Sequence, residues 1–254
     1  MRTRWIYALW ASMLLGSVHV LHAQPATVTP GAPALWLGQF NQLRYSNRLG
    51  LWVDVHLRGT GGDDARLTQS ILRVAPIWYL SDQARLAAGY AWVNHFPNEG
   101  HLYVSQPEHM IWGQFQWFNQ YPRLRTMQWI RLEQRYRRKI LNDYELASGY
   151  TPTSRLRYNL AAFIPVTARK FQPGGLFVAV NDELHMNLGQ PRSYFNQNRA
   201  FAGLGVQTTA HSQLHVGYMH LFVYRSASDT YLRTHTLRIF WFLNLARQYS
   251  KSGT

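Results

Sequence analysis

Residues 49–58 read Leu-Gly-Leu-Trp-Val-Asp-Val-His-Leu-Arg, and apolar side chains occupy every second position of this stretch. An alternation with a period of two indicates a β-strand, because successive side chains leave opposite faces of a sheet. One face would carry Leu49, Leu51, Val53, Val55 and Leu57, and the other Trp52, Asp54, His56 and Arg58. The charged face fits a strand that borders a water-filled interior better than one that borders an apolar core.

The rest of the chain divides into segments of the same kind, which turn residues separate. Strands of soluble domains usually have about five or six residues, and these longer segments suit a tilted membrane crossing. Beyond the N-terminus no window holds a long apolar run, which excludes a helical membrane protein and leaves a barrel. The predicted strands are residues 35–45, 49–58, 68–80, 84–96, 109–121, 125–138, 155–166, 174–186, 196–209, 213–224 and 233–245.

The connections between these segments also alternate in length. Short turns are predicted at residues 46–48, 81–83, 122–124 and 210–212, and longer connections at 59–67, 97–108, 139–154, 187–195 and 225–232. Short periplasmic turns opposite long outer loops are typical of outer-membrane barrels, which in bacteria have an even number of strands. We therefore predict an all-β, antiparallel up-and-down transmembrane β-barrel of about twelve strands, with ten as the alternative. A strand missed within residues 139–154, or a first segment that is not a full span, would explain the odd number of segments.

The N-terminus has the layout of a secretory signal peptide. Arg2 and Arg4 precede an apolar core that runs to Val20, and Ala23 ends a plausible cleavage site. The alternative is an uncleaved anchor, but the apolar stretch is short for a spanning helix. The predicted organisation is a signal peptide, a Pro-rich segment, a barrel and a C-terminal tail, at residues 1–23, 24–34, 35–245 and 246–254, and the predicted location is the outer membrane of a bacterial cell.

The composition restricts the partners of the chain. Its 254 residues carry a formal net charge of +14 and include no cysteine, so disulfides and thiolate metal sites are excluded. The basic residues are almost all arginines, and they are dispersed along the strands instead of forming a run, which argues against nucleic-acid binding. Arginines that line a lumen or face lipid phosphates explain them better. The expected partners are outer-membrane lipid or lipopolysaccharide and the barrel assembly machinery, and the oligomeric state stays open.

One group of polar residues falls on the same faces of neighbouring segments in the middle of the chain. If these faces line one lumen, they form a ladder of arginines and glutamates, in which buried charges have partners. The ladder either fills and rigidifies a small barrel or provides a site or pore lining for an anionic solute. Its predicted members are Arg131, Glu133, Arg135, Arg155, Arg157, Glu183, His185 and Arg199.

Catalytic and metal sites are less well supported by the sequence. Glu133 with His185 would make an acid–base pair, but no nucleophile accompanies them at a recognisable spacing. The eleven histidines lack a carboxylate framework for a metal ion. We therefore predict no catalytic residue, no metal, no cofactor and no enzyme activity. The alternatives are an envelope enzyme that acts on lipid or lipopolysaccharide, and a soluble periplasmic barrel that binds a lipophilic ligand.

The chain resembles the domain-of-unknown-function family numbered 2490, whose members are expected to be outer-membrane barrels. The resemblance extends from about residue 35 to residue 245 and covers nearly all of the predicted mature chain. It implies a barrel in the cell envelope and supplies no activity, substrate or catalytic residue. The residues that carry it are Trp36, the stretch 49–58, Arg131-Leu132-Glu133-Gln134-Arg135, Arg155-Leu156-Arg157-Tyr158, Asn181-Asp182-Glu183 and Phe195-Asn196-Gln197-Asn198-Arg199.

Overall fold

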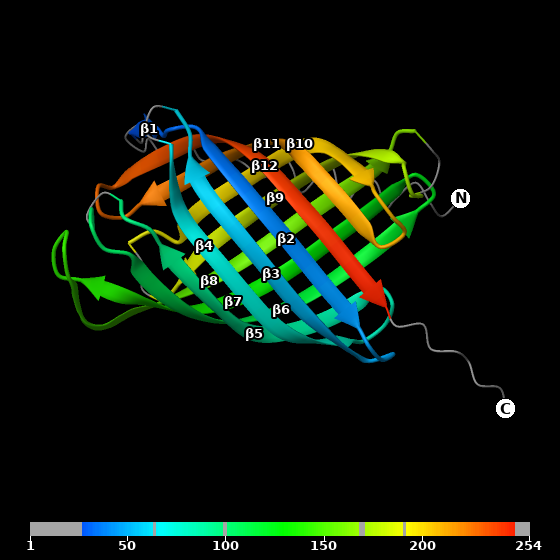
Figure 1. The fold of residues 1–254 in the computed structure, drawn as a ribbon, viewed down its shortest axis with the longest axis horizontal. Helices are drawn as coiled ribbons and strands as arrows, with labels where there is room; N and C mark the ends of the chain where they lie inside the picture. Colours follow the sequence, from blue (N-terminus) through cyan, green and yellow to red (C-terminus); the bar gives the residue numbers. More distant parts are fainter. Residues whose placement is uncertain (1–26, 63–64, 99–100, 168–170, 190–191, 247–254) are drawn as a thin grey trace, which may run out of the picture.

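The computed structural model describes residues 27–62, 65–98, 101–167, 171–189 and 192–246, and these residues form a β-barrel (Figure 1). The predicted signal peptide, and the predicted tail after residue 246, lie outside the described residues. Within them there is no helix long and apolar enough to cross a membrane. The strands are β1 Val28–Pro30, β2 Ala34–Arg44, β3 Leu49–Thr60, β4 Arg66–Tyr79, β5 Ala84–His95, β6 Gln106–Tyr121, β7 Leu124–Ile140, β8 Leu146–Pro165, β9 Leu176–Leu188, β10 Phe195–Gln207, β11 Ser212–Arg225 and β12 Thr230–Ala246.

The strands from β2 to β12 follow one another around the barrel in sequence order, and each pairs antiparallel with the next. The barrel closes where β12 pairs with β2 in parallel. The short strand β1 also pairs in parallel with β12. It lies just before β2 in the chain, so β1 and β2 pair with successive parts of β12. The predicted all-β up-and-down barrel is thus confirmed, with one parallel seam in an otherwise antiparallel sheet.

The sheet has the predicted number of about twelve strands, but the part of it that closes the barrel does not have the expected even number. Eleven strands close the barrel, and the twelfth strand of the sheet is the short β1. Each of the eleven predicted segments overlaps one strand from β2 to β12. An odd number requires the first and last strands of the barrel to run in the same direction, which is why the seam is parallel. The gap at residues 139–154 holds the tip of the β7–β8 hairpin, where Ile140 pairs with Leu146.

The connections at the two ends of the barrel differ less in length than the sequence predicted. We call the end where β2, β4, β6, β8 and β10 finish the turn end, and the opposite end the loop end. At the loop end the strands extend into the predicted long connections, so that residues 61–65 and 141–145 are short links. At the turn end, residues 166–175 form one of the longer connections of the barrel. The strict alternation of short and long connections is therefore only partly present.

The alternation within the strands separates an apolar outer surface from a polar interior. In β3, Asp54 and His56 are buried, whereas Val55 and Leu57 are 43% and 41% exposed on the outside. Arginines and glutamates are among the buried side chains, and leucines, valines and aromatic residues are among the exposed ones. This distribution reverses the usual one for soluble proteins, in which large apolar residues are mostly buried and charged ones exposed.

Two apolar clusters occupy the interior beside the charged residues. One lies on β3 to β6 around Trp52 and Trp112, whose rings meet edge to face. The other brings β2 together with β9 to β12 around Trp36, Phe177 and Phe240. Large aromatic side chains that are fixed in this way give the charged residues between them firm surfaces to pack against.

A charged network and a cavity in the barrel lumen

The eight predicted site residues all come from adjacent strands, β7 to β10. Glu133 pairs in register with Arg155, and Glu183 pairs with Arg199. The arginines and glutamates among the eight line the cavities of the lumen, and His185 is fully buried. The structure therefore brings the predicted residues together inside the barrel, although Arg135 belongs to a separate group of contacts described below.

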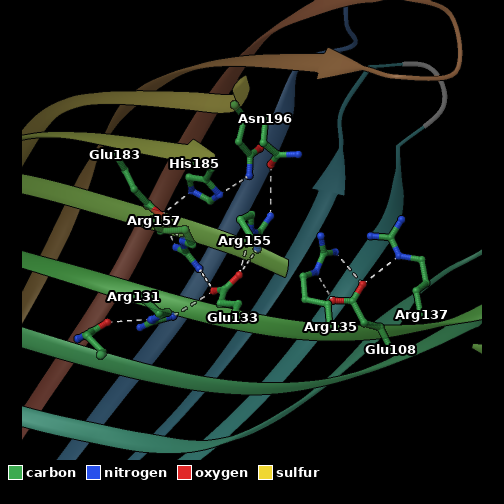
Figure 2. A network of polar contacts seen from close by, with 12 residues as sticks. Glu108, Arg131, Glu133, Arg135, Arg137, Arg155, Arg157, Glu183, His185 and Asn196 are labelled. Carbon is green, nitrogen blue, oxygen red and sulfur yellow. Dashed lines mark hydrogen bonds and ion pairs between the residues drawn. The ribbon is translucent and has the colours of Figure 1, made fainter. Parts of the chain in front are cut away.

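Glu133 is the centre of the network (Figure 2). Arg155 donates to its Oε2 atom from Nε at 2.8 Å and from Nη2 at 2.5 Å. Arg157 donates to Oε1 from Nη1 at 2.6 Å, and Nη1 of Arg131 lies 3.8 Å from the same atom. Hydrogen bonds between charged groups of this kind are about twice as strong as neutral ones. Glu133 thus compensates two buried guanidinium groups at close range.

Glu183 extends the network toward β10. Arg157 bridges the two glutamates, because its Nε atom donates to Oε1 of Glu183 at 2.7 Å. Nε2 of His185 lies 2.6 Å from the same oxygen, and Arg199 Nη1 lies 3.8 Å from Oε2. The other ring nitrogen of His185 lies 2.8 Å from the side-chain amide of Gln197. His185 therefore contacts Glu183, and not the Glu133 of the acid–base pair considered from sequence.

A second carboxylate nearer the loop end has its own set of partners. Both oxygens of Glu108 accept hydrogen bonds from Arg135, each at 2.7 Å, and Arg137 donates to Oε2 at 2.9 Å. His95 Nε2 lies 3.0 Å from the same oxygen. Arg135 thus pairs with Glu108, on β6, and not with Glu133. Sequence reasoning placed Glu108 in a connection, yet its alternation with Met110 and Trp112 would have indicated that it faces the lumen.

A third carboxylate, Asp54, lies on β3. Its oxygens accept a 2.5 Å hydrogen bond from the Trp52 indole and lie 3.0 Å from His56 and 3.1 Å from Arg73. The alternation of residues 49–58 identified the inward position of Asp54. Its partner Arg73, on β4, was missed because the pairing of Asp54 with Arg73 depends on the register between the two strands.

Two cavities lie in the lumen on either side of a charged layer. The larger has a volume of 540 Å³ and reaches the turn end, where the exposed Asp82 lines it. The smaller, of 250 Å³, is lined by Glu108, Arg135 and Arg137. Five side chains from five different strands line both cavities, so we take them as the layer between the two: Trp36, Arg58, Arg73, Arg157 and Arg199.

Five of the arginines that line the large cavity are held differently from those that pair with Glu108. These five donate to the amide oxygen of a Gln or Asn side chain, at 2.8–3.0 Å. An amide oxygen orients a guanidinium group without neutralising its charge, whereas a carboxylate does both. Sequence reasoning missed these pairs because a glutamine in a strand resembles any other polar residue. The pairs are Arg58–Gln69, Arg85–Gln116, Arg125–Gln120, Arg131–Gln114 and Arg238–Asn181.

The charge balance of the large cavity is strongly positive as a result. Among the described residues, nine arginines and two carboxylates line it. Only Arg131 of the five amide-held arginines lies within ion-pair distance of a carboxylate in the described part of the chain. Isolated buried charges are costly unless something pairs with them. The arrangement can therefore bind an anion, which would supply the negative charge that the protein itself does not.

Comparison with protein families gives one result for this chain. Residues 34–232 match the model of the family described as "Protein of unknown function (DUF2490)". The match begins at the first residue of β2 and ends within β12, so it covers nearly the whole barrel. Comparison with curated proteins and with solved structures gives no match. The chain belongs to the DUF2490 family of proteins of unknown function.

Proposed function

We propose that this protein is an outer-membrane β-barrel that binds a small anionic solute in the large cavity of its lumen. The observation that carries the binding site is the excess of arginine over carboxylate around that cavity, with five guanidinium groups oriented by neutral amides. A barrel that used its polar residues only to fill its lumen would gain most from carboxylate partners for every arginine, as around Glu108.

The outer surface supports the membrane location. Its middle part is apolar, with Leu72, Val74 and Ile111 each at least 43% exposed. Exposed aromatic residues lie near the turn end, among them Trp78 and Tyr121, as in the aromatic girdles of membrane barrels. From the middle of the barrel toward the loop end, outward polar side chains pair across neighbouring strands, at 2.5–2.8 Å: Tyr90 with His109, Asp182 with Asn198, and Tyr218 with His235.

The layer between the cavities favours binding over free passage. Trp36 is 8% exposed and Arg199 is 7% exposed, and the Arg199 guanidinium lies 4.8 Å from the Trp36 ring centroid. Arg157 is fixed by both Glu133 and Glu183. These side chains would have to move to open a continuous pore. We therefore expect a closed barrel that holds its solute.

Two measurements test this proposal. Cell fractionation with heat-modifiable gel migration tests the location, since folded membrane barrels resist detergent until they are heated. Native protein in the outer-membrane fraction with two migration forms is expected; mature protein in the soluble fraction would instead favour a periplasmic barrel that binds a lipophile. Calorimetric titration of the purified barrel with benzoate and with phosphate, in a nonionic detergent, tests the binding.

A matched pair of variants makes the titration specific. Arg58→Gln removes one amide-held guanidinium from the cavity and should weaken anion binding, whereas Arg123→Gln removes the same charge from an exposed turn and should not. Planar bilayers that contain the wild-type barrel should show no stepwise conductance. Stable anion-selective steps would show that the lumen passes its solute, and an absence of binding to any anion would leave a structural role.

A further inference from the structure

Three arginines pack on aromatic rings at the inner end of the large cavity, two of them on the ring of Trp36. Trp36, on β2, pairs in register with Arg238 on β12 and with Arg58 on β3. The Arg58 guanidinium lies 3.8 Å from the centroid of the Trp36 ring, and the Arg199 guanidinium lies 4.8 Å from it. Arg238 packs over the Phe201 ring at 3.3 Å. Cation–π contacts hold these groups in place without consuming their hydrogen bonds.

The same three arginines have donors without an acceptor. Among the described residues, the buried Nε atoms of Arg58, Arg199 and Arg238 have no hydrogen-bond partner. Arg199 is 7% exposed and Arg238 is 9% exposed. Buried polar groups are nearly always satisfied in folded proteins, so three orphaned donors in the lining of one cavity indicate an absent acceptor. An acidic group with two or three oxygens, such as a carboxylate or a phosphate, has the charge and the lone pairs that this site lacks.

The lining changes from charged to aromatic toward the turn end. On β12, the inward positions after Arg238 are Phe240 and Phe242, and on β2 the inward Phe40 follows Trp36. The Phe40 ring stacks on the Phe242 ring, with centroids 4.7 Å apart. Phe163 and His215 continue this surface on β8 and β11. One wall of the cavity is thus aromatic beyond the three arginines, and Gln42, Arg44 and Asn244 follow it at the opening.

We propose that the natural ligand is an anionic amphiphile. Its acidic head would lie among Arg58, Arg199 and Arg238, and its hydrocarbon body along the aromatic wall toward the turn end. This inference rests on the proposed anion-binding function and adds the class of ligand and its direction in the cavity. A free inorganic anion would satisfy the arginines alone and would leave the aromatic wall of a 540 Å³ cavity without a partner.

The test compares head, tail and whole ligand on the intact barrel. Native mass spectrometry in a neutral detergent would measure 1:1 adducts with dodecanoate, dodecyl phosphate, dodecan-1-ol, acetate and inorganic phosphate. We expect adducts with one or both of the twelve-carbon acids, at least tenfold weaker binding of the alcohol and of the head-only anions, and a preference that identifies the head as carboxylate or phosphate. Partitioning into the detergent is the same for every variant of the protein, so comparison between variants isolates the site.

The variants separate the head site from the rest of the lumen. Arg238→Gln and Arg58→Gln should each weaken binding of the acids at least tenfold, and Arg123→Gln should leave it unchanged; heat-modifiable migration shows which variants fold. Equal binding of dodecanol and dodecanoate, or acid binding that neither arginine variant weakens, overturns the inference. Inorganic phosphate that binds as tightly as dodecyl phosphate also overturns it but leaves the proposed anion site intact. If no anion binds at all, both proposals fail.

Discussion

Glu133 and Arg238 show two opposite ways in which this barrel treats a buried charge. Glu133 is buried and accepts hydrogen bonds from Arg155 and Arg157. Arg238 has the amide oxygen of Asn181, at 3.0 Å, and aromatic rings as neighbours. Removing one partner of a buried ion pair leaves the other charge uncompensated, whereas removing an unpaired charge relieves a desolvation cost.

Substitutions at these two positions should therefore change stability in different directions. We expect Glu133→Gln to lower the free energy of unfolding by about 3–5 kcal/mol, because Arg155 and Arg157 lose their carboxylate. Arg238→Gln should leave that free energy unchanged or raise it. Guanidinium unfolding of the barrel in lipid vesicles, followed by tryptophan fluorescence, measures both. Equal losses in the two variants would mean that Arg238 stabilises the fold and is not reserved for a ligand.

The inward faces of the strands could be predicted from sequence, but the partners of individual residues could not. Alternation along a strand shows which side chains share a face, and it put Glu133, Arg157 and Glu183 on faces that line the lumen cavities. The alternation within a strand does not give the register between neighbouring strands, and this register brings Arg135 into contact with Glu108 on β6. The orphaned Nε donor of Arg238 could not be predicted either, because it depends on which acceptors the neighbouring strands place around the guanidinium group.

The seam between β2 and β12 is the element that sets this barrel apart from the even-numbered pattern. Its register pairs Leu35 with Leu237, both exposed on the outer face, and Leu43 with Leu245 near the turn end. Residue patterns within each segment predicted the eleven strands but not the direction of the closing pair. That direction follows from the odd number of strands, which departs from the even number usual for bacterial barrels.

An engineered disulfide tests the parallel seam directly. Paired positions in a sheet lie at Cα separations that a disulfide can span, and the native chain has no cysteine to interfere. Leu35→Cys with Leu237→Cys should form an intramolecular disulfide in the folded barrel, seen as altered gel migration that a reductant reverses. Leu35→Cys with Leu245→Cys, at opposite ends of the seam, should not. Cross-linking of the second pair and not the first would mean that the strands close in the opposite direction.

Across the whole molecule, the polar interior and the apolar exterior require each other if the barrel lies in lipid. The strands satisfy their own backbone hydrogen bonds because the sheet closes, so that no edge faces the hydrocarbon. The arginines of the lumen are shielded from the lipid by the barrel wall, and the outward leucines and valines need no water. In aqueous solution the same exterior would be a large exposed apolar surface, which soluble monomers rarely have.

An arginine placed on the outer face distinguishes these two environments. Val74 lies on β4 with 43% exposure between the outward Val53 and Tyr90, whereas Leu141 is 64% exposed in the β7–β8 connection. In a membrane, Val74→Arg should cost about 2–4 kcal/mol and reduce the heat-modifiable form, because a charge at mid-depth loses its hydration. Leu141→Arg, outside the apolar band, should fold like the wild type. If the barrel is soluble, both arginines meet water and change stability by less than about 0.5 kcal/mol, so matching behaviour of the two variants would contradict the membrane location.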